Sequence, residues 1–170
     1  MQTEIVRLHT SGHERRAVMT GADGFVAEIA PAATAGHKES GVPASVTIAQ
    51  AALESAWGAN APGNNLFGIK ADPSWCGRVV PVVTHEVVSG KRVEITAMFR
   101  AYLDWAGSIK DHASFLTGNE RYRAAFTCKD GPSFARAIAA AGYATDPQYA
   151  DKLIAIIHDN NLERFDTAAI

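Results

Sequence analysis

The spacing of apolar residues along the chain predicts a mostly helical protein. Residues 23–38 repeat apolar side chains at helical intervals, with Phe25 and Ile29 on one face. Residues 43–58 are apolar on nearly every side of the helix that they would form, and such a helix is usually buried. We therefore expect an amphipathic first helix and a buried second one, with Ser45 as a candidate cap of the second.

Two runs rich in β-branched residues predict a β-hairpin in the middle of the chain. Residues 79–88 and 91–102 flank Ser89-Gly90, a pair that suits a two-residue turn. In the second run apolar and polar side chains alternate, so one face of the hairpin should be apolar. With a two-residue turn Glu86 lies opposite Val93, whereas a slip of one residue would reverse the faces.

After the hairpin the pattern returns to helices, predicted over residues 104–116, 133–141 and 148–160. Two helices, a hairpin and three more helices make an α+β domain in which a small β element interrupts a helical core. No linker or internal repeat divides the chain, so we expect a single domain over residues 23–170. Residues 1–22 have weak periodicity and are predicted to form an arm or a short helix.

Length and composition narrow the functional classes without selecting one. The chain has 170 residues, of which 47% are hydrophobic and 20% charged, and this is ordinary for a soluble globular domain with its own core. The formal net charge of -2 gives no reason to expect nucleic acid as a partner. No apolar stretch is long enough to span a bilayer, and the N-terminus lacks the apolar run of a Sec signal peptide. We expect a monomer without stable membrane insertion.

Metal and redox chemistry find little support in the sequence. Cys76 and Cys128 lie far apart and form neither a CxxC pair nor a zinc pattern, so free thiols are predicted. His9 and His13 have no third ligand nearby. Motifs of serine hydrolases, P-loop proteins and dinucleotide-binding proteins do not occur. We expect no metal and no other cofactor.

Glu54 is the only charged residue within residues 41–68. A carboxylate on a buried helix loses hydration, which disfavours its charged form and raises its pKa. A carboxylic acid that stays protonated near neutrality can donate its proton, so Glu54 is a candidate general acid. Gln50 shares its line on the helix, Trp57 lies beside it, and both are candidate substrate-binding residues. The alternative is a structural glutamate paired with an arginine or lysine.

Two loops carry residue types that suit sugar binding. Residues 64–70 include Asn65 and Phe67, and asparagine amides suit sugar hydroxyl and acetamido groups. Tyr143 and Tyr149 bracket a proline turn, and exposed tyrosine rings pack against sugar faces. Each loop also has a simpler interpretation: a turn with a buried apolar anchor for the first, and a capped helix with core aromatics for the second.

Cleavage of a glycosidic bond usually needs a second carboxylate, which acts as base or nucleophile. The predicted hairpin supplies Glu86 and Glu94, and Glu86 is the better candidate because it follows His85 in a β-rich run. A charge that protects an edge strand from aggregation is an equally good interpretation of Glu86.

Four segments of the chain together resemble one enzyme family. In order they read Ala49-Gln-Ala-Ala-Leu-Glu-Ser-Ala-Trp-Gly58, Asn64-Asn-Leu-Phe-Gly-Ile-Lys70, Phe99-Arg-Ala-Tyr102 and Tyr143-Ala-Thr-Asp-Pro-Gln-Tyr-Ala150. They resemble the family 73 glycoside hydrolases, the glucosaminidase domain of bacterial autolysins, flagellar rod-cap proteins and phage lysins. The resemblance implies a lysozyme-like α+β fold that is mostly helical, with the hairpin lobe flanking the cleft.

The same resemblance implies hydrolysis of peptidoglycan glycan strands, usually at the β-1,4 bond on the reducing side of N-acetylglucosamine. Glu54 matches the general acid of the family, and Glu86 matches the position often proposed for the second carboxylate. Tyr149 matches a tyrosine that lines the cleft, and Trp57 and Asn65 fall in motifs beside it. The acetamido group of the substrate is an alternative nucleophile, in which case Glu86 would position only water or charge.

Other activities on the same strands remain alternatives. Lytic transglycosylases also use a Glu-Ser helix, but they typically continue with Gly-Leu-Met-Gln, where this chain has Asn-Leu-Phe-Gly-Ile-Lys. The other two alternatives are a muramidase and a non-catalytic scaffold that binds glycan or serves in assembly. The lack of a signal peptide and of wall-binding repeats favours a phage or prophage endolysin, released through a holin or delivered by a virion. Its site of action would be the cell wall or periplasm.

Overall fold

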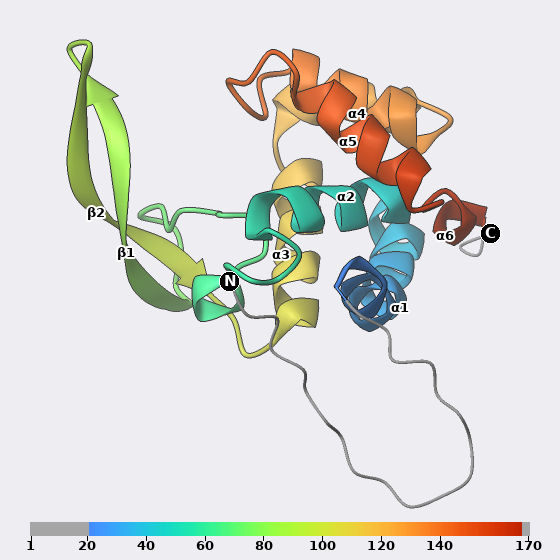
Figure 1. Cartoon of the computed structure of the whole chain (residues 1–170), viewed down its shortest axis with the longest axis horizontal. Helices are drawn as coiled ribbons and strands as arrows, with labels where there is room; N and C mark the ends of the chain where they lie inside the picture. The colour runs from blue at the N-terminus through green and yellow to red at the C-terminus, as the bar shows by residue number, and fades with distance from the viewer. Residues whose placement is uncertain (1–20, 168–170) are drawn as a thin grey trace, which may run out of the picture.

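The computed structural model describes residues 21–167, apart from the side chains of residues 85–88. Figure 1 shows a group of helices with one β-hairpin projecting from it. The elements are α1 (Ala22–Ser40), α2 (Ala44–Ser55), η1 (Pro62–Asn64), β1 (Arg78–Val88), β2 (Lys91–Ala101), α3 (Trp105–Thr117), η2 (Glu120–Thr127), α4 (Gly131–Ala140), α5 (Tyr149–Asp159) and α6 (Arg164–Thr167), where η marks a 3-10 helix. The predicted α+β architecture is confirmed.

The hairpin has the predicted turn and register. Ser89 and Gly90 both have positive φ, at 52° and 77°, as a tight two-residue turn between twisted strands requires. The strands pair antiparallel, and Glu86 lies opposite Val93. Ile95, Ala97 and Phe99 are half-buried, whereas Thr96 and Met98 between them are exposed, so the predicted apolar face is present.

Helix α2 lies at the centre of the helical body, as its apolar sequence predicted. All residues from Ala44 to Ala52 are buried, and α1, α4, α5 and α6 pack around the helix. Ser45 is not its cap, because the helix begins one residue earlier and its N-cap, Pro43, has no side-chain donor or acceptor. Instead Asp166 of α6 accepts hydrogen bonds from the Ser45 N–H (2.9 Å) and from its hydroxyl (2.6 Å).

The later helices match the prediction within one or two residues. Asp104 and Asp130, which precede α3 and α4, each accept a backbone N–H from the first turn with their carboxylates. The helix η2 was not predicted, because only Tyr122 and Ala125 of its eight residues are buried and no long periodic pattern marks it. Helix α6, a single turn, was missed for the same reason.

The described residues include both cysteines but not the predicted N-terminal arm. Helix α1 begins at Ala22, and the arm or short helix predicted for the preceding residues lies outside the described residues. Cys76 and Cys128 are free thiols, as predicted. Within residues 21–167 no helix is both long enough and apolar enough to cross a membrane.

Candidate active site

Glu54 stands at the last turn of α2, where the buried helix reaches the surface. The helix ends because Ala56 and Trp57 adopt left-handed conformations with φ of 50° and 59°, and Gly58 follows with φ of 82°. The Ser55 hydroxyl secures this end by accepting the Gly58 N–H at 2.8 Å. Glu54 is therefore exposed, and the expectation that this glutamate is buried was wrong.

A chain of hydrogen bonds connects this carboxylate to the protein interior. The fully buried Gln50 donates from Nε2 to the Tyr149 hydroxyl at 2.9 Å, and that hydroxyl donates to Glu54 Oε1 at 3.0 Å. Tyr149 is itself buried, so its predicted role as an exposed sugar-stacking ring is not what its position allows. Gln50 likewise lies behind the surface and supports Tyr149.

The pKa of Glu54 is raised above its ordinary value because surrounding protein partly displaces water from the carboxylate. The hydrogen bond from Tyr149 acts in the opposite direction, since it favours the charged form. The net effect is a raised pKa for this exposed side chain. The direction is the one that a proton donor needs.

A pocket of about 460 Å³ opens beside Glu54. Its walls come from the loop before β1, from β2, from α3 and η2, and from the loop before α5. The lining residues are Glu54, Phe67, Gly68, Ile69, Lys70, Asp72, Arg100, Phe115, Arg121, Tyr122, Tyr143 and Ala144. Of the predicted site residues, Glu54, Phe67 and Tyr143 therefore share this pocket.

Stacked aromatic rings support the pocket from within. Phe67 stacks on the fully buried His112 with ring centroids 3.8 Å apart and planes 8° apart. Tyr143 stacks on Tyr149 at 5.6 Å and 18°. Burial lowers the pKa of His112 to about 3, so this imidazole is neutral and packs as an aromatic ring. The two stacks hold the aromatic wall rings in fixed orientations.

Asn65 shapes the loop, and its side chain has no capacity left for a sugar. Its Nδ2 donates to the carbonyls of Ile69 (2.9 Å) and Arg100 (2.8 Å), and its Oδ1 accepts the N–H groups of Phe67 and Ile69. An amide offers two donor hydrogens and two acceptor lone pairs, and all four are used. The residue is buried, which the loop composition alone did not reveal.

Trp57 lies outside this group of side chains, and Glu86 is described only by its backbone. The sequence placed Trp57 beside Glu54 on the surface of one helix. Helix α2 ends before Trp57, so this arrangement does not form. Its ring packs edge-on against Phe25 of α1 at 5.9 Å and does not line the pocket. The backbone of Glu86 lies near the hairpin turn, and its side chain is outside the described part of the structure.

The sequence did not single out the charged residues of the pocket. Lys70, Asp72, Arg100 and Arg121 all line it. Hydrogen bonds from Ser74, and then from Arg100, lower the pKa of Asp72 to about 2, so this carboxylate is ionised at neutral pH. No residue spacing could have marked these four, because they come from three separate elements.

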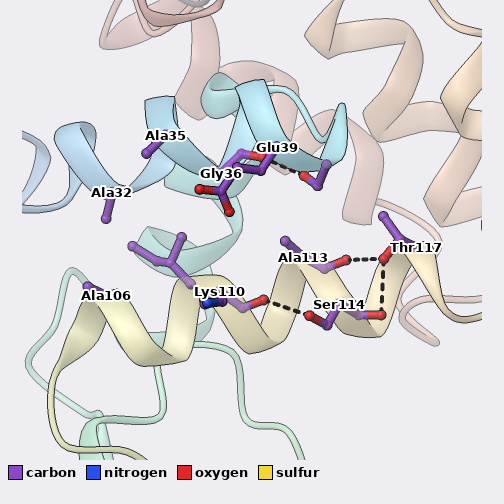
Figure 2. A pocket seen from close by; sticks show the side chains of 11 residues that line it. Ala32, Ala35, Gly36, Glu39, Ala106, Lys110, Ala113, Ser114 and Thr117 are labelled. Carbon is purple, nitrogen blue, oxygen red and sulfur yellow. Dashed lines mark hydrogen bonds between the residues drawn. The ribbon is translucent and has the colours of Figure 1, made fainter.

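A larger hollow of about 550 Å³ lies elsewhere, between α1 and α3. Figure 2 shows the small side chains of Ala32, Ala35 and Ala113 there, with Glu39 and Lys110 at its edge. It shares no residue with the pocket beside Glu54 and has no comparable chain of buried hydrogen bonds. Among the described residues no group of three histidines, cysteines or carboxylates could hold a metal ion.

Comparison with known proteins identifies the family of the chain. Residues 30–162 match the Glucosaminidase family, whose description is mannosyl-glycoprotein endo-beta-N-acetylglucosaminidase. The chain belongs to this glucosaminidase family. Its relatives include peptidoglycan hydrolase FlgJ of Vibrio parahaemolyticus, 43% identical over 79% of this chain and 46% of the relative. Exo-glucosaminidase LytG of Bacillus subtilis is 42% identical over 72% of this chain and 45% of the relative.

A third relative is named for a different bond. The probable N-acetylmuramidase of Lactococcus lactis is 37% identical over 91% of this chain and 37% of the relative. The chain thus spans less than half the length of these curated relatives.

Solved structures of family members share the fold. The catalytic domain of the autolysin Auto from Listeria monocytogenes superposes with a TM-score of 0.79 at 32% identity, over 89% of this chain and 90% of that one. The glycoside hydrolase domain of FlgJ from Salmonella typhimurium gives a TM-score of 0.72 at 34% identity, over 88% and 94%. The predicted lysozyme-like α+β fold is confirmed.

Proposed function

We propose that this chain hydrolyses β-1,4 glycosidic bonds in the glycan strands of peptidoglycan, on the reducing side of N-acetylglucosamine. One observation carries the proposal: a carboxylate with a raised pKa, held by a buried tyrosine, at the edge of a pocket in a glucosaminidase fold. The name of the FlgJ relative, a peptidoglycan hydrolase, supports the substrate class, and the name of the LytG relative, an exo-glucosaminidase, supports cleavage at a glucosamine residue. We infer that the chain acts at the cell wall or periplasm, where that substrate lies.

In this proposal Glu54 gives its proton to the leaving glycosidic oxygen. The rings of Phe67 and Tyr143 line the pocket and offer apolar surface to a sugar. Glu86 is the proposed second carboxylate, which either activates water or attacks the sugar itself. Its place on the hairpin makes its approach to Glu54 depend on how the hairpin is held.

The products of digestion test the bond specificity. Purified peptidoglycan would be digested with the chain, and the fragments identified by mass spectrometry. We expect reducing N-acetylglucosamine ends. Reducing muramic acid ends would instead establish the muramidase activity named for the Lactococcus relative, and anhydro-muramic ends a lytic transglycosylase.

Substitution of the two carboxylates tests their roles. Glu54→Gln should leave folding intact and lower the rate by about 10²–10⁴-fold, because general acid catalysis typically contributes that much. Glu39→Gln is the matched control, since Glu39 is exposed on α1 and lines the other hollow. Equal lysis by the Glu54 variant would show that the assignment of Glu54 as the acid is wrong, whereas no lysis by the wild-type chain would favour the non-catalytic scaffold. Glu86→Gln should lower the rate more than about tenfold, and a smaller fall would remove Glu86 from the catalytic residues.

A further inference from the structure

In the part of the structure that is described, the hairpin joins the helical body at its base. Figure 1 shows the strands running outward from η1 and the loop before β1, with the turn at the far end. Backbone hydrogen bonds at this base run from Ala71 N to the Met98 carbonyl (2.9 Å) and from Tyr102 N to the Gly63 carbonyl (2.8 Å). Any residue that fixes the angle of the hairpin must therefore act there.

Arg100 lies at this base and bridges two acidic side chains. Its Nη1 donates to both carboxylate oxygens of Asp111 on α3, at 2.9 and 3.2 Å, and its Nη2 donates to Asp72 at 2.6 Å. The guanidinium also lies 4.6 Å over the ring of Trp75. One side chain of β2 thus connects the hairpin with both the loop before β1 and helix α3.

The neighbouring groups complete the connection. The Arg100 N–H donates to the Ile69 carbonyl at 3.0 Å, and its carbonyl accepts from the buried Asn65 amide. Tyr102, the first residue after β2, donates its hydroxyl to Asp111 at 2.7 Å. The sequence assigned no role to the segment Phe99-Arg-Ala-Tyr102. Its two polar side chains, Arg100 and Tyr102, both bind the carboxylate of Asp111 on α3.

The contacts of Arg100 suit a residue that holds the hairpin in place. Only 13% of the Arg100 side chain is exposed, so its ion pairs are shielded from solvent better than ordinary surface pairs. The planar guanidinium of Arg100 binds two carboxylates through two separate nitrogens, Nη1 to Asp111 and Nη2 to Asp72, and the single ammonium group of lysine does not reproduce this geometry.

We propose that Arg100 is a positioning residue that fixes the hairpin lobe against the helical body, and thereby sets the catalytic hairpin wall opposite Glu54. The inference rests on the proposed function for its catalytic consequence, but the attachment of the lobe is a property of the fold. Arg100 acts through Asp111 and Asp72 and not by contact with the glycan, although it lines the pocket.

Hydrogen–deuterium exchange tests the attachment directly. The variants are Arg100→Lys, Arg100→Gln and Asp111→Ala, with Arg92→Gln as the control, because Arg92 is exposed near the hairpin turn. Exchange of residues 65–77 and 91–101 should accelerate by about tenfold or more in the first three, as expected for the loss of charge-assisted hydrogen bonds. It should stay at the wild-type rate in Arg92→Gln. Unchanged exchange in both Arg100→Lys and Asp111→Ala would overturn the proposal.

Enzyme kinetics separate positioning from substrate contact. Arg100→Gln and Asp111→Ala should each lower kcat/KM, and the double variant should lose no more than about twofold beyond the worse single one, because both break the same connection. Arg100→Lys should resemble Arg100→Gln. Additive losses, or full activity of Arg100→Lys, would show that the charge of Arg100 serves the glycan and would overturn the proposal. If wild-type protein lysed no peptidoglycan, the proposed function would fail while the exchange result would still decide the attachment.

Discussion

At the scale of single residues, Glu54 and Tyr149 act as a pair. Tyr149 is buried, and burial raises the pKa of its hydroxyl, so the group stays protonated and donates to Glu54. Gln50 donates to the same hydroxyl from behind and fixes its orientation. The carboxylate is therefore open to a substrate on one side and held by the protein on the other.

This pairing predicts the pH dependence of Tyr149→Phe. A general acid works in its protonated form, so the rate should fall as the pH rises through the pKa of Glu54. The Tyr149 hydroxyl lowers that pKa by favouring the carboxylate. Its removal should raise the pKa further and move the alkaline limb of the kcat profile to higher pH.

The control for this prediction is Tyr143→Phe. Tyr143 also lines the pocket, but in the described structure its hydroxyl makes no hydrogen bond to Glu54. The alkaline limb should keep its position in this variant. A limb that moved to lower pH in Tyr149→Phe would contradict the assignment of Glu54 as the acid.

At the scale of elements, α2 depends on α6 for its beginning. The first N–H groups of a helix lack partners within it, and Pro43 has no side chain that can supply one. Asp166 supplies it from the far end of the chain, and a carboxylate at a helix N-terminus also interacts favourably with the helix dipole. The central helix is thus completed by a contact across almost the whole sequence.

Asp166→Ala tests this contact. The substitution should lower the free energy of unfolding by about 1–2 kcal/mol, the upper part of the range for lost helix caps. The measurement is the midpoint of urea denaturation at an unchanged m-value. Glu163→Ala is the control, since Glu163 is exposed beside α6, and should change stability by no more than about 0.5 kcal/mol. Equal effects of the two substitutions would contradict the cap.

At the scale of the whole molecule, the buried core and the hairpin are separate parts. The buried core lies in the helices and in the loops that connect them, and it includes none of the hairpin side chains that the structure describes. The hairpin exposes apolar side chains such as Val83, which is 61% exposed. The helical body should therefore determine unfolding, while the hairpin contributes mainly to the pocket.

Two matched truncations test this division. Ile48→Ala removes a fully buried side chain from α2 and should cost about 2–5 kcal/mol of stability. Val83→Ala removes an exposed side chain from β1 and should cost no more than about 1 kcal/mol. Both values come from denaturant unfolding, and similar costs would mean that the hairpin and the body form one cooperative core.

The sequence by itself determined the long helices and the hairpin, because each of these has a local signal that the short helices η2 and α6 lack. Apolar periodicity marked α1, α2 and the later helices, and Ser89-Gly90 fixed the hairpin register that pairs Glu86 with Val93. A single charge in an apolar segment marked Glu54. These signals depend only on neighbours in the chain, and so they can be read without knowing the fold.

Only the tertiary structure decided how exposed Glu54 is and what surrounds it. Helix α2 ends early because Ala56 and Trp57 adopt left-handed conformations. Glycine is the residue that usually marks such a turn in a sequence, and neither of these residues is a glycine. The burial of Tyr149 and the saturation of Asn65 depend on partners far away in the sequence. So does the bridging of Asp72 and Asp111 by Arg100. Such contacts depend on how the elements pack against one another. The sequence does not distinguish a polar side chain that binds a ligand from one that binds the protein's own backbone.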